Sequence, residues 1–159
     1  MDAVEPAEIV AATVAALRKA GAPTEVRVAT LRAAFGRTRL RPAGDVWRLG
    51  ALCLDAEGGV WATGDVLVVT EPTHPNFRSE DALARNELRA LLVRAGVPVG
   101  ATAVVDAVPL DLDAVDPPLV ATPEGLGVMW TRGGAAVPFG RYLEERADLL
   151  IHPPQRATD

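Results

Sequence analysis

The sequence predicts an α+β protein with a largely antiparallel sheet, built from two hairpins that pack with three to four helices. Three observations predict this class. The chain has 159 residues, a length typical of a single domain. Apolar residues make up 49% of it, enough for a sizeable core. Stretches of helical periodicity alternate along the chain with β-rich runs separated by turn residues. We expect one domain over residues 1–159, with only the last six or so residues frayed.

The first two elements differ in clarity. Residues 5–20 predict a helix, because Ile9, Val10, Val14 and Leu17 form one apolar stripe and Gly21 can terminate it. Residues 24–36 are ambiguous. Thr24 suits a helix N-cap, whereas the alternation in "EVRVATL" also fits a strand, and we favour the helix.

A hairpin is predicted next, from the runs "DVWRLGALCL" and "VWATGDVLVV" on either side of "DAEGG". If the loop between the two runs has an even number of residues, one face carries Trp47, Leu49, Ala51 and Cys53 with Ala62, Gly64, Val66 and Val68. The opposite face would then carry Arg48, Gly50, Leu52 and Leu54 beside Trp61, Thr63, Asp65 and Leu67. An odd loop would move the second strand's side chains to the other face, because a shift of one residue inverts a strand.

The second half contains the clearest helix, at residues 79–98, with Ser79 as its N-cap and Gly96 and Pro98 at its end. Residues 101–110 predict a short strand, and residues 119–131 predict a second hairpin that turns at residues 123–125. Residues 138–154 predict a last helix, which Pro153 stops.

Composition excludes several classes of protein. The net charge of -5 argues against nucleic-acid binding, which normally requires a basic excess. The N-terminus has no signal-peptide pattern and no apolar run approaches a membrane span, so we expect a cytoplasmic protein with no membrane contact. One cysteine excludes an internal disulfide, and no Cys/His spacing or nucleotide-binding motif indicates a metal or other cofactor.

The apparent nucleophiles have structural explanations. Cys53 lies between Leu52 and Leu54 within a predicted strand, which favours a buried small side chain over a reactive thiolate. Ser79 is followed by "EDA", so neither serine-enzyme motif is present and capping explains it. The acidic run of Asp106, Asp111, Asp113 and Asp116 lacks the calcium-loop pattern, and we interpret it as solvated turns.

The loop "TEPTHPNFRS" and the first hairpin supply the candidate site. Glu71, His74 and Arg78 lie in this loop, which contains two prolines, just before a helix start, where a titrating imidazole and a cation favour an anion. The alternative is an exposed loop without a ligand. Arg48 and Asp65 would be diagonal neighbours on the hairpin face of Trp61 if the loop is even. Gly50 and Gly64 would mark either close approach of a ligand or a bend.

The blocks "VWRLGALCLDAEGGVWATG", "VVDAVPLDLDA" and "YLEERADLLIHPP" resemble a group of small actinobacterial proteins, over roughly residues 30–155. Some of these proteins are named glutaminase, and the resemblance implies that activity without assigning catalytic residues. The residues argue otherwise. The serine-dependent glutaminases need S-x-x-K, and the amidotransferase type needs a cysteine at a glycine-flanked turn. Cys53 in "ALCLD" is not such a cysteine, so we do not expect glutaminase activity.

These observations lead to three hypotheses. The first is a binding module for a protein partner or small ligand, with Arg48, Trp61, Asp65, His74 and Arg78 as the candidate binding residues. The second is a small hydrolase with His74 as general base and Asp65 or Glu71 as the orienting carboxylate. The third is a homo-oligomer, formed through an exposed sheet or an apolar helix surface.

Overall fold

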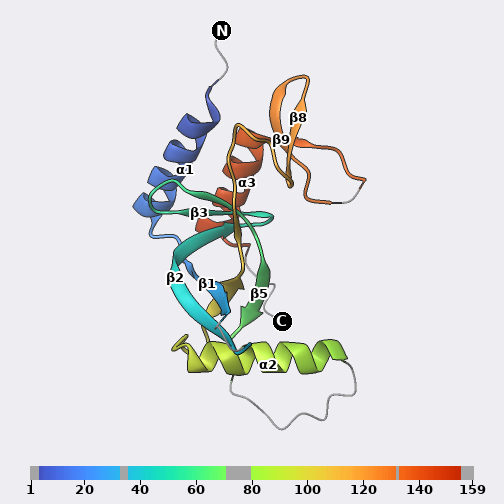
Figure 1. Ribbon diagram of the computed structural model, residues 1–159. Helices are drawn as coiled ribbons and strands as arrows, with labels where there is room; N and C mark the ends of the chain where they lie inside the picture. The colour runs from blue at the N-terminus through green and yellow to red at the C-terminus, as the bar shows by residue number, and fades with distance from the viewer. Residues whose placement is uncertain (1–3, 33–35, 71–79, 132, 155–159) are drawn as a thin grey trace. The chain divides into compact units, whose positions relative to one another are not determined.

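The computed structural model describes residues 4–32, 36–70, 80–131 and 133–154, and shows an α+β protein (Figure 1). The chain forms two compact units, each described here by itself. Unit 1 comprises Met1–Thr24, Val46–Thr63 and Val108–Asp159, and unit 2 comprises Glu25–Asp45 and Gly64–Ala107. Among the described helices, none is long and apolar enough to cross a bilayer.

Unit 1 contains two helices, α1 (Pro6–Ala20) and α3 (Phe139–Ile151), and two sets of strands. The first set has the order β2-β3-β4-β7 and is antiparallel. Its members are β2 (Thr38–Leu49), which contributes residues 46–49 to this unit, β3 (Leu52–Asp55), β4 (Val60–Ala62) and β7 (Val108–Pro109). A small second sheet has the order β10-β9-β8, from Val137–Pro138, Gly125–Val128 and Leu119–Thr122.

The core of unit 1 forms where one face of these strands packs against both helices. Trp47, Leu49, Leu52, Leu54 and Val60 supply the strand side. The helices supply Val10, Val14 and Leu17 from α1 and Phe139, Tyr142 and Leu143 from α3. In α1 these residues recur at the spacing of one helix face, and Pro6 and left-handed Gly21 (φ 62°) bound the helix.

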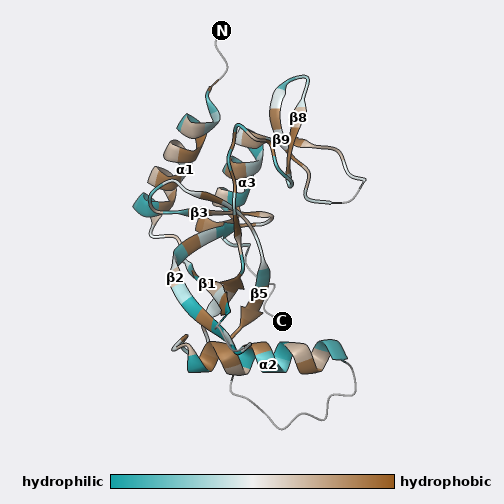
Figure 2. Cartoon of the chain, in the orientation of Figure 1, coloured by the Kyte–Doolittle hydropathy of each residue, from teal (hydrophilic) through white to brown (hydrophobic). Residues whose placement is uncertain are grey.

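Unit 2 contains one helix, α2 (Glu80–Arg94), and strands in the order β5-β6-β1-β2. These are β5 (Asp65–Val68), β6 (Thr102–Val105), β1 (Glu25–Arg32) and residues 38–45 of β2. The β5–β6 pair is antiparallel and the β1–β6 pair is parallel. Val28, Leu67, Val69 and Leu92 belong to the core between α2 and the strands. Hydrophilic residues interrupt the apolar ones along α2 (Figure 2), and within this helix only Leu92 is fully buried.

Most predicted elements are confirmed. The helices at 5–20, 79–98 and 138–154 correspond to α1, α2 and α3, and the hairpin at 119–131 corresponds to β8 and β9. The helix favoured at residues 24–36 is wrong, because Glu25–Arg32 forms strand β1. Its register with β6 buries Val28, so sheet pairing on a β-branched, alternating segment outweighs the capping signal of Thr24. The described residues therefore contain three helices.

The first hairpin is divided into shorter strands than predicted, and its odd-loop alternative is confirmed between β3 and β4. "DVWRLGALCL" is two strands, since β2 ends at Leu49 and Gly50 (φ 67°) opens a tight turn into β3. "VWATGDVLVV" is also two strands, β4 and β5, which pair with different partners. The pairing of Cys53 with Trp61 gives the odd register between β3 and β4.

Candidate functional site

Arg48 and Trp61 share one face of the unit 1 strands. Arg48 lies opposite Cys53, and Cys53 lies opposite Trp61, so all three side chains project away from the face that carries Trp47. The prediction had placed Leu52 and Leu54 with them, which is wrong, because the turn at Gly50 moves those two leucines to the core face. The odd loop then returns Trp61 to the side of Arg48.

The indole of Trp61 takes part in the turn between β3 and β4. Its Nε1–H donates to Asp55 Oδ2 at 3.0 Å, while Asp55 Oδ1 accepts from the backbone N–H groups of Gly59 and Glu57 at 2.7 and 2.9 Å. Burial acts to raise the pKa of Asp55, but the hydrogen bonds from Trp61, Gly59 and Glu57 outweigh it and hold that pKa below its ordinary value. Asp55 and Trp61 therefore stabilise the turn.

Cys53 is buried, as the sequence predicted, and its neighbours complete the hairpin. Its Sγ lies 3.4 Å from Thr63 Oγ1, and Thr63 Oγ1 donates to the carbonyl of Gly50 at 2.8 Å. The Tyr142 hydroxyl accepts from the N–H of Ala51 at 2.8 Å and packs against Gly50, where a Cβ would collide with it. Gly50 thus serves the turn and close packing of α3.

Asp65 belongs to unit 2, where it is paired with Val105 of β6. The predicted diagonal pairing with Arg48 in one hairpin is therefore wrong, because the second run leaves the hairpin after β4. Gly64 marks the departure, since a Cβ there would meet the backbone carbonyl of Val105. Glu71, His74, Arg78 and the predicted cap Ser79 lie outside the described residues.

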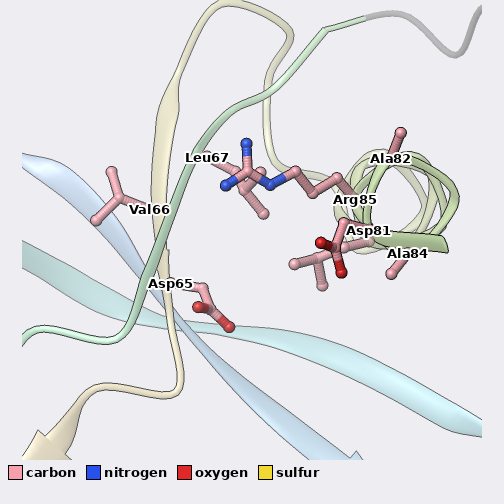
Figure 3. Close-up of a pocket in the computed structure, with 8 residues that line it drawn as sticks. Asp65, Val66, Leu67, Asp81, Ala82, Ala84 and Arg85 are labelled. Atoms are coloured by element: carbon pink, nitrogen blue, oxygen red, sulfur yellow. The ribbon is translucent and has the colours of Figure 1, made fainter. Parts of the chain in front are cut away.

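Asp65 lines a pocket of about 720 Å³ in unit 2, between β5 and the first turns of α2 (Figure 3). The lining residues are Asp65, Val66 and Leu67 from β5 and Asp81, Ala82, Ala84, Arg85 and Leu88 from α2. Arg85 extends from the helix towards β5, and the carboxylates of Asp65 and Asp81 both border the open space. This volume lies in the range of ligand pockets, roughly 300–1,000 Å³.

The three charged side chains of this pocket have no partner in the part of the chain that the structure describes. No side-chain hydrogen bond or ion pair joins Asp65, Asp81 or Arg85 to another described residue, and all three side chains are exposed. Asp81 and Arg85 are one helical turn apart, so they lie on the same side of α2. The spacing of Asp81 and Arg85 was the signal in the sequence that could have added them to the candidate site.

A second hollow, in unit 1, has a different lining. It follows the contact between α1 and α3, has a volume of about 570 Å³, and is apolar along its floor, where Ile9, Ala12 and Ala147 line it. Carboxylates of Glu8, Glu144 and Asp148 border it, and none of its lining residues in the described part of the chain is basic. This hollow corresponds to the apolar helix surface that the self-association hypothesis requires.

The acidic run predicted from the sequence does not gather at one place in either unit. Asp106 ends β6 with a left-handed backbone (φ 58°) and accepts from Thr30, both from its N–H at 2.9 Å and from its hydroxyl at 2.7 Å. Asp111 accepts from the N–H of Asp113 within a turn. Over the described ranges, no three His, Cys, Asp or Glu side chains are grouped to hold a metal ion.

No family model, curated protein or solved structure matches the chain, so these comparisons assign it no family. Function is therefore inferred from the placement and chemistry of the side chains.

Proposed function

We propose that the protein is a binding module and that its ligand occupies the pocket between β5 and α2. The observation that carries the proposal is the group of Asp65, Asp81 and Arg85, which border one pocket without partners among the described residues. These exposed charges make no side-chain interaction within the described fold, and ligand pockets typically place a small number of polar groups where a ligand can reach them. Two carboxylates and one guanidinium would suit a ligand that carries a cationic group close to an acceptor.

A display selection with random linear peptides tests this proposal. We expect the wild-type protein to enrich peptides that contain Lys or Arg, and we expect Asp65→Asn with Arg85→Gln to weaken their binding roughly tenfold or more. Glu87→Gln is the matched control, because Glu87 is an exposed α2 residue that does not line the pocket. Failure to enrich any peptide, or equal binding by the pocket variant and the control, would contradict the proposal.

A small hydrolase is the alternative, because Asp65 borders a pocket large enough for a substrate. It requires His74 as the general base, with Asp65 or Glu71 orienting the imidazole. A survey of chromogenic esters and amides tests it: turnover that is lost in both His74→Ala and Asp65→Asn would favour the hydrolase. Turnover unchanged in His74→Ala would exclude this mechanism. We do not propose glutaminase activity, since the sequence lacks the serine motif.

A further inference from the structure

Strand β5 presents a free edge beside the pocket. It is the first strand in the order β5-β6-β1-β2, and among the described strands it pairs with β6 alone. A row of unpaired backbone N–H and C=O groups can form hydrogen bonds with an additional strand. Val66 and Val68 on this strand are 38% and 52% exposed.

The hydrogen-bond pattern identifies which backbone groups face outward. Val69 N–H donates to the carbonyl of Ala101 at 2.8 Å, which continues the register that pairs Leu67 with Ala103. Bonded residues alternate along an antiparallel strand, so Asp65, Leu67 and Val69 direct their backbone groups towards β6. Val66 and Val68 therefore direct theirs towards the open edge.

The side chains of β5 alternate between the two faces of the sheet, and one of these faces lies against α2. Leu67 is buried in the core beneath α2 and also lines the pocket. Val66 borders the pocket too, but its side chain, like that of Val68, projects to the other face of the strand (Figure 3). A strand added to β5 would place alternate side chains over the pocket, close to Asp65 on β5 and to Asp81 and Arg85 on α2. The pocket would then contact side chains of the added segment, while the backbone of β5 forms hydrogen bonds with its backbone.

We propose that the ligand is an extended segment of a partner protein that adds to the edge of β5 and directs a basic side chain to Asp65 and Asp81. This proposal rests on the proposed function and names its class of ligand. Arg85 would accommodate an acidic side chain or a carbonyl of the same segment.

Charge complementarity selects this occupant over a second copy of β5. The strand has the sequence Asp-Val-Leu-Val and carries no basic residue, so two paired copies would leave Asp65 and Asp81 without a cation from the added strand. A basic segment of a partner supplies that cation.

Substitution at the outward-facing amide tests the backbone contact. Val68→Pro removes one N–H from the free edge, and proline is tolerated at an edge position of this kind. For the peptides enriched by the wild-type protein, we expect roughly tenfold or more weaker binding, because one bond is lost and a peptide carbonyl is left without a donor. Val68→Thr is the matched control and should bind as the wild type does. Circular dichroism of both variants checks that the fold is kept.

A second measurement leaves the protein unchanged. Single N-methyl groups are introduced at successive residues of an enriched peptide, and strand addition predicts loss of binding at every second position. Loss at consecutive positions, or at none, would overturn strand addition even if the charge variants still weaken binding, in which case the proposed function would stand. A selection that enriches no peptide would overturn both. Concentration-dependent dimers that Val68→Pro dissociates, and that the peptides do not dissociate, would assign the edge to a second copy and overturn the proposal.

Discussion

The polar side chains near the strands of unit 1 and those around the pocket of unit 2 differ in their partners. In unit 1, the polar groups near the strands bind other parts of the unit: Tyr142 accepts from Ala51, Trp61 donates to Asp55, and Trp47 Nε1–H donates to the carbonyl of Ala22 at 3.1 Å. In unit 2, Asp65, Asp81 and Arg85 border a pocket and make no such bond with a described residue. The difference teaches that chemically distinctive residues, such as a tryptophan or a lone cysteine, are poor guides to a site until their partners are known.

The largest expected loss in the free energy of unfolding comes from creating a cavity in the core of unit 1. Leu143 of α3 is fully buried among residues of α1 and the strands. We expect Leu143→Ala to lower the free energy of unfolding by about 2 to 5 kcal/mol, from lost burial and the cavity left behind. Urea denaturation measures this value. A loss below about 1 kcal/mol would show that α3 contributes little to the core that we assign to it.

A smaller effect is expected from removing one hydroxyl group. Tyr142→Phe leaves the N–H of Ala51 without its acceptor while the ring stays in place beneath Gly50. We expect a loss of about 1 to 3 kcal/mol in the free energy of unfolding, the cost of an unpaired donor in a partly buried position. Urea denaturation of the variant checks it. An unchanged unfolding midpoint would mean that the hydroxyl is not needed for the turn between β2 and β3, and would weaken the contrast between the units.

The sequence predicted most elements of the fold, because their signals are local. The apolar stripe of α1, the helix start before Glu80 and the turn between β8 and β9 depend on neighbours within a few residues. The strand at β1 was considered but not favoured over a helix, because its state depends on pairing with β6, more than 70 positions later in the chain. No short-range pattern could reveal that pairing.

The candidate site was predicted only in part, for the same reason. Asp65 was named, but its assignment to a hairpin face with Arg48 assumed that residues 60–69 form one strand. Gly64 breaks that run, and only the backbone of Val105 explains why a glycine is needed there. Asp81 and Arg85 carried a readable signal, a spacing of four on a helix, although nothing in the sequence placed β5 opposite them.

The role of Asp55 in the turn between β3 and β4 of unit 1 can be tested through the pH dependence of stability. Because its pKa is lower in the folded protein than the ordinary value of 3.8, Asp55 stabilises the fold above that value, and the contribution is lost as the pH falls below it. We expect Asp55→Asn to cost about 1 kcal/mol at neutral pH, since one amide oxygen cannot replace two carboxylate oxygens. The cost should shrink in acid. Urea denaturation across pH measures it, with Asp45→Asn as the control on an exposed carboxylate. A cost that stays constant from neutral pH to acid would contradict the role of the ionised carboxylate.

The smallest effect on stability is expected at the pocket, and it sharpens the comparison most. Asp65→Asn and Arg85→Gln remove charges that bind no other described residue, so the free energy of unfolding should change by no more than about 0.5 kcal/mol. Binding of the enriched peptides should fall in the same variants. Thermal unfolding and a binding titration on one protein preparation compare the two quantities. If either substitution instead destabilised the protein as much as Tyr142→Phe, that side chain would serve the fold, and the proposed site would lose the observation on which it depends.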